Sequence, residues 1–460
     1  MSAAAGQPPE PDGLALLGPG VTAASVTDHV AGIVIARPSP RFWWLAFGIG
    51  FLLMMLLLAS IAWILVRGVG VWGVNVPVAW GFAIVNFVWW IGIGHAGTLI
   101  SAILLLMKQT WRNSINRFAE AMTLFAVACA GMFPLLHLGR PQVFYWLFPY
   151  PDTMNLWPQW RSPLVWDVFA VTTYGIVSLV FWYVGLVPDL ATIRDRADQP
   201  WKQRLFGIFA LGWRNSALHW RRHQSLYLLL AALATPLVAS VHSIVGLDFA
   251  ISIVPGWHST VFPPYFVAGA IFSGFAMVLT LIIPIRAVYG LHAYITGRHL
   301  DFMARVMLAT GLMVSYGYLS EAFFAYYSGS RYEKYMMLNR ALGPFAPAFW
   351  ALILCNVAAI QFLWLGRVRR GPLALFLISI VINIGMWLER FVIVITSLHR
   401  DYLPSAWGDY NATRWDWATF LGTLGFFLAC MFLFIRFVPL LSIYELREMV
   451  HARAEHGGNA

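Results

Sequence analysis

The chain has 460 residues, of which 60% are hydrophobic, 16% aromatic and only 11% charged, and its mean hydropathy is +0.70. A soluble chain usually has about a quarter charged residues, so this composition excludes a soluble globular protein and indicates a polytopic membrane protein. We ascribe the formal net charge of +10 to basic loops at an anionic membrane surface and expect no nucleic-acid partner.

Cysteine usage limits the redox chemistry that the chain can carry. Its three cysteines, Cys129, Cys355 and Cys430, are too few for a disulfide framework, and the sequence has no CxxC and no CxxCH motif. We therefore expect no metal, iron–sulfur cluster or attached haem to be bound by this chain alone.

Residues 1–41 are small, weakly apolar and rich in Pro and Gly, without a basic segment that leads into an apolar core. We expect a tail with no cleaved signal peptide. Ten segments follow that are apolar over the roughly 20 residues that a membrane-spanning helix needs. They are residues 42–66, 80–107, 116–138, 164–187, 225–245, 264–289, 301–327, 346–365, 372–399 and 417–438.

The sequence therefore predicts an all-α membrane domain over residues 42–440, followed by a second tail at 441–460. We expect spans 2–5 (about 80–245) and spans 6–9 (264–399) to form two four-helix bundles, flanked by spans 1 and 10. Ten spans place both termini on one side. Loops and tails on that side carry 20 Lys and Arg, against 8 on the other, which predicts cytoplasmic termini. Seven of the 20 fall in 188–224, which we interpret as a solvated, lipid-facing basic loop.

A set of ionisable residues falls at one depth, near the membrane surface opposite the termini. A charge in the bilayer costs several kcal/mol unless it is paired or hydrated, so each is a functional candidate. The set comprises His137, Asp167, His242, Asp248, Glu321, Glu389 and Arg390. Structural roles are the alternatives: a helix-start acceptor for Asp167, a headgroup-level position for His137 and a place near the aqueous boundary for His242.

Such a cluster beside aromatic walls suits a quinol, whose oxidation releases two protons and therefore needs two acceptors. We predict His137 and Asp167 as the acceptors, on adjacent helices, and Arg390 as the residue that keeps the carboxylate ionised. Adjacent residues on a helix diverge by about 100°, so we expect Arg390 and not Glu389 to face the site. Glu321 is expected either to pair with Arg390 or to carry protons.

A second, sparser set lies toward the termini. His95 is near the middle of span 2 between small residues, and Glu120 is on the inner part of span 3. Together they could form half of a proton relay, with Glu321 as a further candidate. The alternative for His95 is a hydrogen bond to a neighbouring helix. The aromatic, Pro-rich connection at 139–162 is either an interfacial belt or a docking face for an extracytoplasmic subunit.

Three stretches together resemble a known family: GIGHAGTLISAILLLMKQTWRNSINRFAEAMTLFAV, FPLLHLGRPQVFYWLFPYP and SPLVWDVFAV. They resemble the NrfD-like membrane subunits of the polysulfide reductase family over about residues 42–440. Within it they are most similar to the quinol-oxidising ActC subunits of bacterial alternative complex III.

The resemblance implies two four-helix bundles in a bacterial cytoplasmic membrane and a menaquinol site near the outer face. Its site residues would be His137, Asp167, Asp248 and Arg390, with His95 in a proton path. It also implies an extracytoplasmic iron–sulfur subunit that takes the electrons, c-type cytochrome subunits and a paralogous membrane subunit. The chain would then belong to a respiratory or photosynthetic complex that couples quinol oxidation to proton translocation.

Three other interpretations stay open. The same fold could be a quinone-reducing membrane anchor of a molybdenum reductase, because the sequence does not fix the direction of electron flow. A secondary transporter would place polar groups at mid-depth on broken helices, whereas most charged groups here lie toward one face. A scaffold subunit without chemistry is the third.

Overall fold

The computed structural model describes residues 16–36, 38–147 and 159–457, and all regular elements in those ranges are helices. Ten of them are long and apolar enough to cross a membrane. They are α2 (Arg41–Arg67), α3 with its continuation η2–α4 (Gly81–Leu106), α5 (Asn116–His137), α6 (Pro163–Arg196), α8 (Ala217–Ala250), α9 (Phe262–Val288), α10 (Gly297–Tyr327), α12–η6–η7 (Ala346–Trp364), α14 (Pro372–Leu398) and α15 (Arg414–Phe437). The predicted fold class is confirmed.

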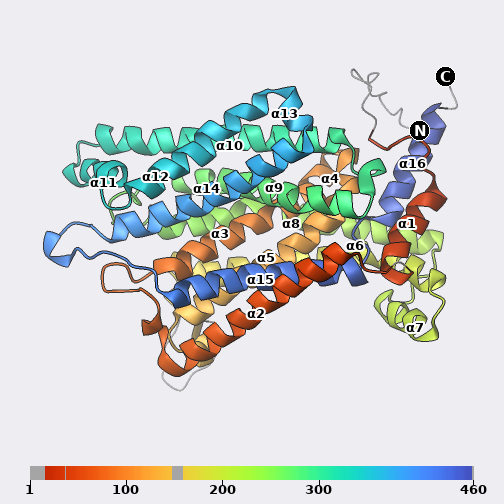
Figure 1. Ribbon diagram of the computed structural model, residues 1–460, viewed down its shortest axis with the longest axis horizontal. Helices are drawn as coiled ribbons and strands as arrows, with labels where there is room; N and C mark the ends of the chain where they lie inside the picture. The colour runs from red at the N-terminus through yellow and green to blue at the C-terminus, as the bar shows by residue number, and fades with distance from the viewer. Residues whose placement is uncertain (1–15, 37, 148–158, 458–460) are drawn as a thin grey trace.

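The first and last described helices, α1 (Ala23–Ile35) and α16 (Ile443–Gly457), lie at one end of the helix stack (Figure 1), as ten spans require. Three shorter helices gather at this end, which we call the terminal face: α1 (Ala23–Ile35), α7 (Pro200–Phe209) and α16 (Ile443–Gly457). The opposite end, the far face, carries α11 (Arg331–Leu342). The predicted tails are thus partly helical, and α1 packs against α16.

Helices α3 and α9 form the centre and pack against five and four other spans, respectively. Helix α3 contacts α5, α9, α14, α8 and α15, while α9 contacts α3, α10, α8 and α14. The first helix of each predicted bundle therefore meets the last helix of the other, as two units of similar topology would allow. The division into bundles at 80–245 and 264–399 stays a prediction.

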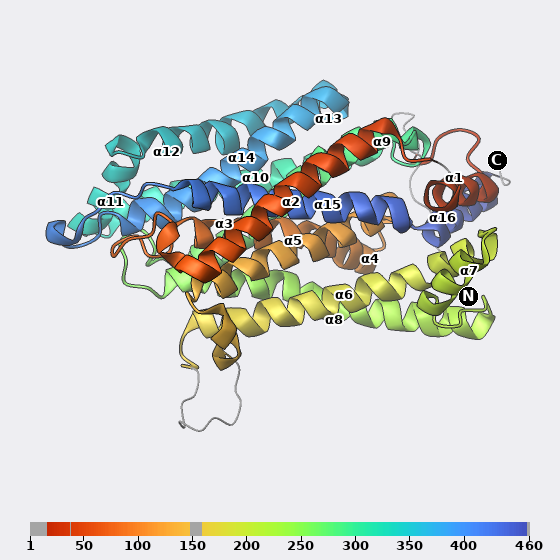
Figure 2. The ribbon, with the colours of Figure 1, turned by 60° about the horizontal axis from the view of Figure 1, so that its bottom comes forward.

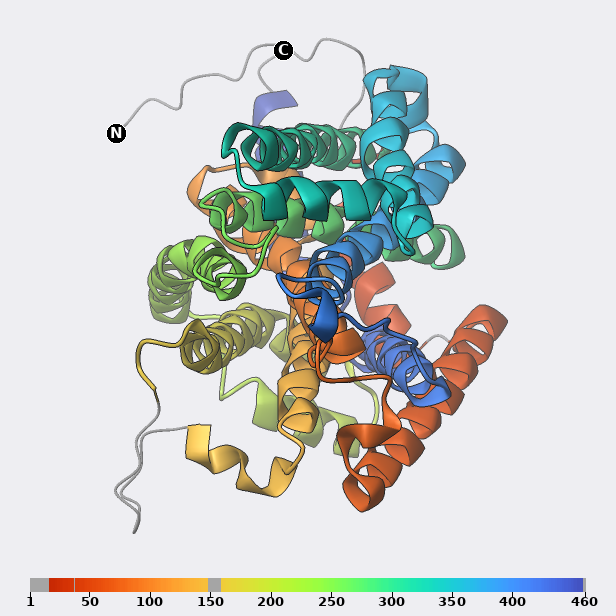
Figure 3. The ribbon, with the colours of Figure 1, turned by 90° about the vertical axis from the view of Figure 1, so that its left-hand side faces the viewer.

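The first and last spans, α2 and α15, pack along each other at one edge, with α10 and α12 at the opposite edge (Figures 1 and 3), and α2 crosses the front of the molecule in Figure 2. Glycine permits this close approach, because a Cβ atom at Gly425 would lie 2.2 Å from the Cβ of Leu53. In the same way a Cβ at Gly97 would lie 2.1 Å from the carbonyl oxygen of Ala119. Gly97 thus lets α3 lie directly against α5, two residues after His95.

Two helices are longer than predicted, and this changes the setting of several residues. Helix α6 continues through Pro188 to Arg196, and α8 extends from Ala217 to Ala250. Most of the predicted loop 188–224 is therefore helical. Asp248 lies in the last turn of α8 and not in a loop, so the prediction for its setting is wrong. The apolar sequence pattern stops at charged residues beyond the hydrocarbon core, whereas α6 and α8 continue past that point.

Candidate functional site

A pair of carboxyl groups lies at the far face. Asp167 is one turn inside the start of α6, and Asp248 is in the last turn of the neighbouring helix α8. The two carboxyl groups lie within interaction range of each other, and the Oδ1 atom of each is buried without a hydrogen-bond partner among the described residues. If the two groups share one proton in a hydrogen bond, the pair can accept another.

His137 is the last residue of α5, at the same face as the carboxyl pair. Helix α5 packs against α6, and the helix continues through Pro134, whose carbonyl accepts a hydrogen bond from the Leu138 amide at 3.2 Å. The Nδ1 atom of His137 is buried without a hydrogen-bond partner. No hydrogen bond joins His137 to Asp167 in the part of the chain described, so each has an atom free for a third group.

Two fully buried histidines form a second site nearer the middle of the bundle. The Nδ1 atom of His242 on α8 lies 3.1 Å from the Nε2 atom of His95 on α3, and both residues are 0% exposed. His242 precedes Asp248 by six residues, an axial rise of about 9 Å. The sequence offered a place near the aqueous boundary as the structural alternative for His242, whereas the structure buries it beside His95.

The hydrogen bonds of the histidine pair define its tautomers. His95 Nδ1 lies 2.8 Å from the carbonyl oxygen of Ile91, so this nitrogen carries the hydrogen and Nε2 is the acceptor. His242 must then donate from Nδ1, which leaves its Nε2 atom as an acceptor, and that atom has no partner among the described residues. A proton that arrives at His242 Nε2 can pass to His95 along the existing bond.

Hydroxyl groups line the next layer toward the terminal face. The ring of Tyr174 stacks on His95 with centroids 5.0 Å apart, and its hydroxyl donates to the Gly94 carbonyl at 2.9 Å. Thr98 Oγ1 lies 2.7 Å from the same hydroxyl, and Thr123 donates to Gly94 at 2.5 Å. These groups connect α3, α5 and α6 at the depth of the histidines.

Glu120, three residues before Thr123 on α5, belongs to a buried network of charges. It pairs with Arg117 at 2.9 Å and accepts a hydrogen bond from the Tyr227 hydroxyl at 3.1 Å. Arg117 also lies 3.6 Å from Asp189 on α6. These side chains are at most 4% exposed, so each charge depends on the others for its compensation.

The carboxyl-terminal helix closes this network at the terminal face. Glu445 on α16 is 3% exposed; it pairs with Arg112 at 2.7 Å and accepts from Asn116 at 2.5 Å. The adjacent Tyr444 donates from its backbone amide to Asp189 at 3.1 Å. Burial raises the pKa of the Tyr444 phenol, which therefore remains a donor to Glu445 at 3.2 Å. Titratable groups thus extend from the histidine pair to the terminal face.

Arg390 is not beside Asp167, contrary to the predicted ion pair. Its guanidinium lies 2.6 Å from its neighbour Glu389 and 4.2 Å from the ring centroid of Phe266. Both charged residues are buried, at 2% and 1% exposed, so the expectation that only Arg390 turns inward is also wrong. Two long side chains can curl around the helix to meet, which the 100° between their Cα–Cβ bonds does not prevent.

Glu321 pairs with Arg340 of α11 at 2.7 Å, not with Arg390. Arg340 is 2% exposed although it belongs to a predicted loop, and no sequence signal pointed to it. Glu389 accepts a hydrogen bond from Tyr318, which in turn accepts one from Asn356 at 2.8 Å. The proton-carrying role predicted for Glu321 stays a prediction, whereas the predicted pairing of Arg390 with Asp167 or Glu321 is wrong.

Other sequence predictions meet the structure only in part. Residues 148–158 of the predicted docking connection lie outside the described residues. In the described ranges no group of three or more His, Cys, Asp and Glu side chains could hold a metal ion.

The sequence analysis missed three residues of the buried network. Asp189 and Glu445 fall in a predicted loop and a predicted tail, and Tyr227 carries no charge that would mark it within a span.

The fold defines a multi-pass membrane protein whose interior contains several buried acid–base side chains. The family comparison agrees: the model described as polysulphide reductase, NrfD, matches residues 70–400. The chain belongs to this family of membrane proteins.

Two curated proteins are similar over most of the chain. One is a putative membrane subunit of dimethyl sulfoxide reductase from Halobacterium salinarum, 26% identical over 400 residues, which cover 79% of this chain and 83% of the relative. The other is a subunit of the selenate reductase of Mesobacillus selenatarsenatis, 20% identical over 399 residues, which cover 81% and 88%. The family predicted from the sequence is confirmed, whereas nothing found links the chain to alternative complex III.

Proposed function

We propose that the chain is the quinone-reactive membrane anchor of a molybdenum-type oxidoreductase complex, with its quinone site at the far face. The observation that carries the proposal is the Asp167–Asp248 carboxyl pair, whose Oδ1 atoms lack further partners. The names of the two relatives, both of them reductase subunits, favour this alternative over the alternative-complex-III interpretation of the sequence. They lend no support to a transporter.

The far-face residues suit the two protons of the quinol–quinone couple. Oxidation of a quinol to a quinone releases two electrons and two protons. The carboxyl pair holds one proton already and can accept one, and His137 Nδ1 can accept the other. The electrons must leave to a group in another protein of the complex, and an extramembrane iron–sulfur subunit at the far face fits that need. Reduction of a quinone follows the same proton- and electron-transfer steps in reverse.

The kind of partner would set the direction of electron flow. A partner that reduces an acceptor draws electrons from quinol, while a partner that oxidises a donor delivers them to quinone. We propose menaquinone as the quinone and the cytoplasm as the side of the terminal face, on the basis of the resemblance and of the 20-to-8 distribution of basic residues. Cytochrome and paralogous membrane subunits remain proposals from the resemblance.

Protons released or taken up at the far face would communicate with the terminal face through His242, His95 and the network around Glu120. His242 Nε2 is the open position at the far-face side of this series. The series gives the complex a means of coupling quinone chemistry to proton movement, which extends the predicted roles of His95 and Glu120.

The test is turnover of the complex purified with its partner subunits, driven in each direction in turn: menaquinol with an oxidised acceptor, then menaquinone with a reduced donor. Asp248→Asn preserves the shape of the pair and should slow the active direction by about 10²–10⁴-fold. Asp401→Asn, on the loop that follows α14 at the far face, is the matched control and should turn over like wild type. Wild-type turnover of Asp248→Asn in an assembled complex would contradict the site.

A further inference from the structure

Two hollows lie on either side of Trp213 at the terminal face. One is a cavity of about 470 Å³ between α1, the end of α6 and α16, and the other is a groove of about 260 Å³ between α6 and α8. Trp213 lines both and is fixed by Arg194, whose guanidinium donates to its carbonyl oxygen at 3.0 Å, and by an edge contact with Trp220 at 5.0 Å.

The groove crosses the boundary of the hydrocarbon core. Its membrane side is lined by Tyr183, Val184, Val187 and Leu226, and its outer rim by Arg222 and His219. The apolar stretches of α6 and α8 end near Val187 and begin near Ser225, so the first set lies at acyl-chain depth and the second at headgroup depth. An apolar slot below a cation is complementary to a lipid with an anionic headgroup.

One residue that lines the groove carries a buried nitrogen atom without a hydrogen-bond partner. His223 lines it and is 6% exposed. Its Nε2 atom donates to the Val184 carbonyl at 3.1 Å, while Nδ1 has no hydrogen-bond partner among the described residues. The unpartnered nitrogen is an acceptor, which suits a hydrogen-bond donor such as a hydroxyl of a glycerol headgroup.

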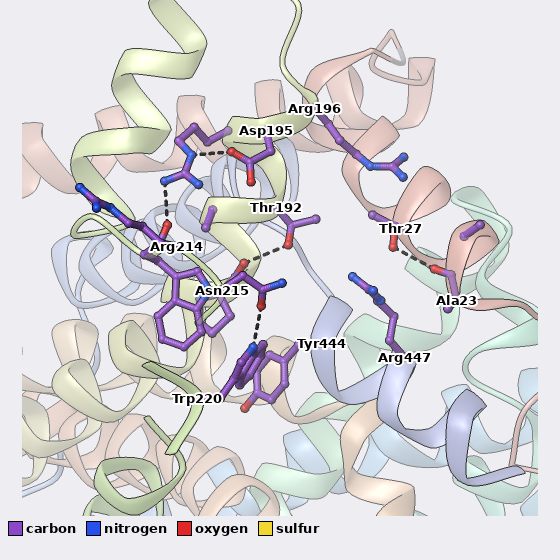
Figure 4. A pocket seen from close by; sticks show the side chains of 15 residues that line it. Ala23, Thr27, Thr192, Asp195, Arg196, Arg214, Asn215, Trp220, Tyr444 and Arg447 are labelled. Carbon is purple, nitrogen blue, oxygen red and sulfur yellow. Dashed lines mark hydrogen bonds and ion pairs between the residues drawn. The ribbon is translucent and has the colours of Figure 1, made fainter. Parts of the chain in front are cut away.

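The cavity beyond Trp213 has more cations than the protein neutralises (Figure 4). Arg194 pairs with Asp195 and Arg196 with Asp28. Arg214 and Arg447 also line the cavity, and neither has an ion pair in the described part of the chain. Three guanidinium groups that make no ion pair with the described residues therefore line the two hollows and could bind an anion: Arg214, Arg222 and Arg447.

Helix α7 places this region at a membrane surface. Trp201, Ile208 and the following Leu211 are 61%, 70% and 70% exposed, and basic Lys202 and Arg204 alternate with them. Exposed apolar side chains next to cations on a short helix are typical of a helix that lies in the headgroup layer. An exposed apolar helix of this kind would be unfavourable in water.

We propose that the junction of α6, α7 and α8 binds an anionic phospholipid, with its phosphodiester near Arg222 and Arg214 and an acyl chain in the groove along Val184 and Val187. The sequence predicted a solvated, lipid-facing basic loop over 188–224; in the structure this segment is mostly helical and helps to line the cavity and the groove. Basic pockets beside membrane helices are a recurring site for anionic headgroups.

The test is lipid binding to the purified full chain in detergent, measured by native mass spectrometry with phosphatidylglycerol and phosphatidylcholine. Phosphatidylglycerol should bind more tightly than phosphatidylcholine. The double variant Arg214→Gln/Arg222→Gln should weaken phosphatidylglycerol binding by about 30-fold, because it removes two cations near the phosphate. Arg41→Gln/Arg367→Gln is the matched control, since both residues are exposed on the terminal side and lie outside the two hollows.

A second arm fills the groove without a change of charge. Val184→Trp should abolish tight binding of phosphatidylglycerol, whereas Val180→Trp, on the exposed face of α6 one turn away, should not. An equal loss of phosphatidylglycerol affinity in Arg214→Gln/Arg222→Gln and in Arg41→Gln/Arg367→Gln would mean that lipid binding responds only to the overall charge, and would overturn the site. Equal affinity for phosphatidylglycerol and phosphatidylcholine would overturn it as well. Displacement of the lipid by inorganic phosphate or glycerol 3-phosphate at comparable concentration would assign the cavity to soluble phosphates and exclude the lipid.

Discussion

The Nδ1 atom of His242 lies 3.1 Å from the Nε2 atom of His95, and the two rings are fully buried between α3 and α8. This contact joins a residue six positions from the far-face carboxyl pair to a residue that borders the buried network of α5. We propose that protons pass between the two sites through this contact.

Replacement of His242 by Gln should therefore separate proton movement from quinone binding. Gln can still donate to His95 but cannot accept and pass on a proton, so we expect proton-coupled turnover to fall by about 10²-fold or more. The affinity for quinone should change little, because His242 is not one of the far-face residues. The measurement is quinone turnover together with proton release in proteoliposomes, with His258→Gln as the control.

Unchanged turnover and unchanged proton release in both His242→Gln and His95→Gln would give the pair a structural role only. His258 is a suitable control because it is also a far-side histidine but lies in a loop, where its Nδ1 atom contacts the Ser252 carbonyl at 2.9 Å.

The carboxyl pair predicts non-additive kinetics. If Asp167 and Asp248 share one proton and act as one base, either Asn substitution removes the function. Each single variant should lose about 10²–10⁴-fold in turnover, and Asp167→Asn/Asp248→Asn should be no slower than the worse single variant. Turnover of all four forms under one set of conditions checks this. Losses that multiply in the double variant would mean that the two carboxyl groups act independently.

The helices could be predicted from the sequence because a membrane span is a local property of about 20 residues. Predicted span 42–66 differs from α2 by one residue at each end, and predicted span 116–138 differs from α5 by one residue at one end. Helix ends beyond the bilayer, as at Arg196 of α6, were predicted poorly because polar residues there stop the apolar pattern without stopping the helix.

Pairing between charges could not be predicted in the same way, since it depends on packing of distant segments. Depth in the membrane indicated only that Arg390 could pair with Asp167 or with Glu321. In the structure Arg390 forms an ion pair with Glu389, and Glu321 forms one with Arg340. The partner of Arg112, Glu445, is 333 residues away in a predicted tail. His95 and Glu120 were selected correctly as buried polar groups, yet their partners, His242 and Arg117, followed only from the fold.

Arg390 should contribute to stability more than to the pH optimum. Because its carboxylate partner is Glu389 and not Asp167, Arg390→Leu leaves an unpaired buried carboxyl group, which typically costs about 3–5 kcal/mol. We expect a lower melting temperature in detergent and a pH optimum close to that of wild type. The double variant Arg390→Leu/Glu389→Leu, which removes both charges, should recover part of the stability. An upward shift of the pH optimum at normal stability would instead link Arg390 to the far-face carboxyl pair.

Arg340 and Glu321 connect α11 to α10, and their ion pair predicts how firmly the far-face helix is held. Arg340 also donates to Ser397 of α14 at 3.3 Å, so it ties three helices together. Arg340→Leu should lower the free energy of unfolding by about 3–5 kcal/mol, whereas Arg331→Leu, at the exposed start of α11, should have a small effect. Denaturant unfolding followed by tryptophan fluorescence can compare the two variants.

The orientation of the whole molecule can be tested independently of its chemistry. The basic residues favour the terminal face by 20 to 8, and basic loops stay in the cytoplasm. A fluorescent reporter that matures only in the cytoplasm should therefore be active when it is fused after α16, and a periplasmic phosphatase fused there should be inactive. A fusion of the same phosphatase within the loop after α14, at residues 403–409, should be active. The reverse pattern would place the carboxyl pair on the cytoplasmic side, out of reach of an extracytoplasmic electron-transfer protein.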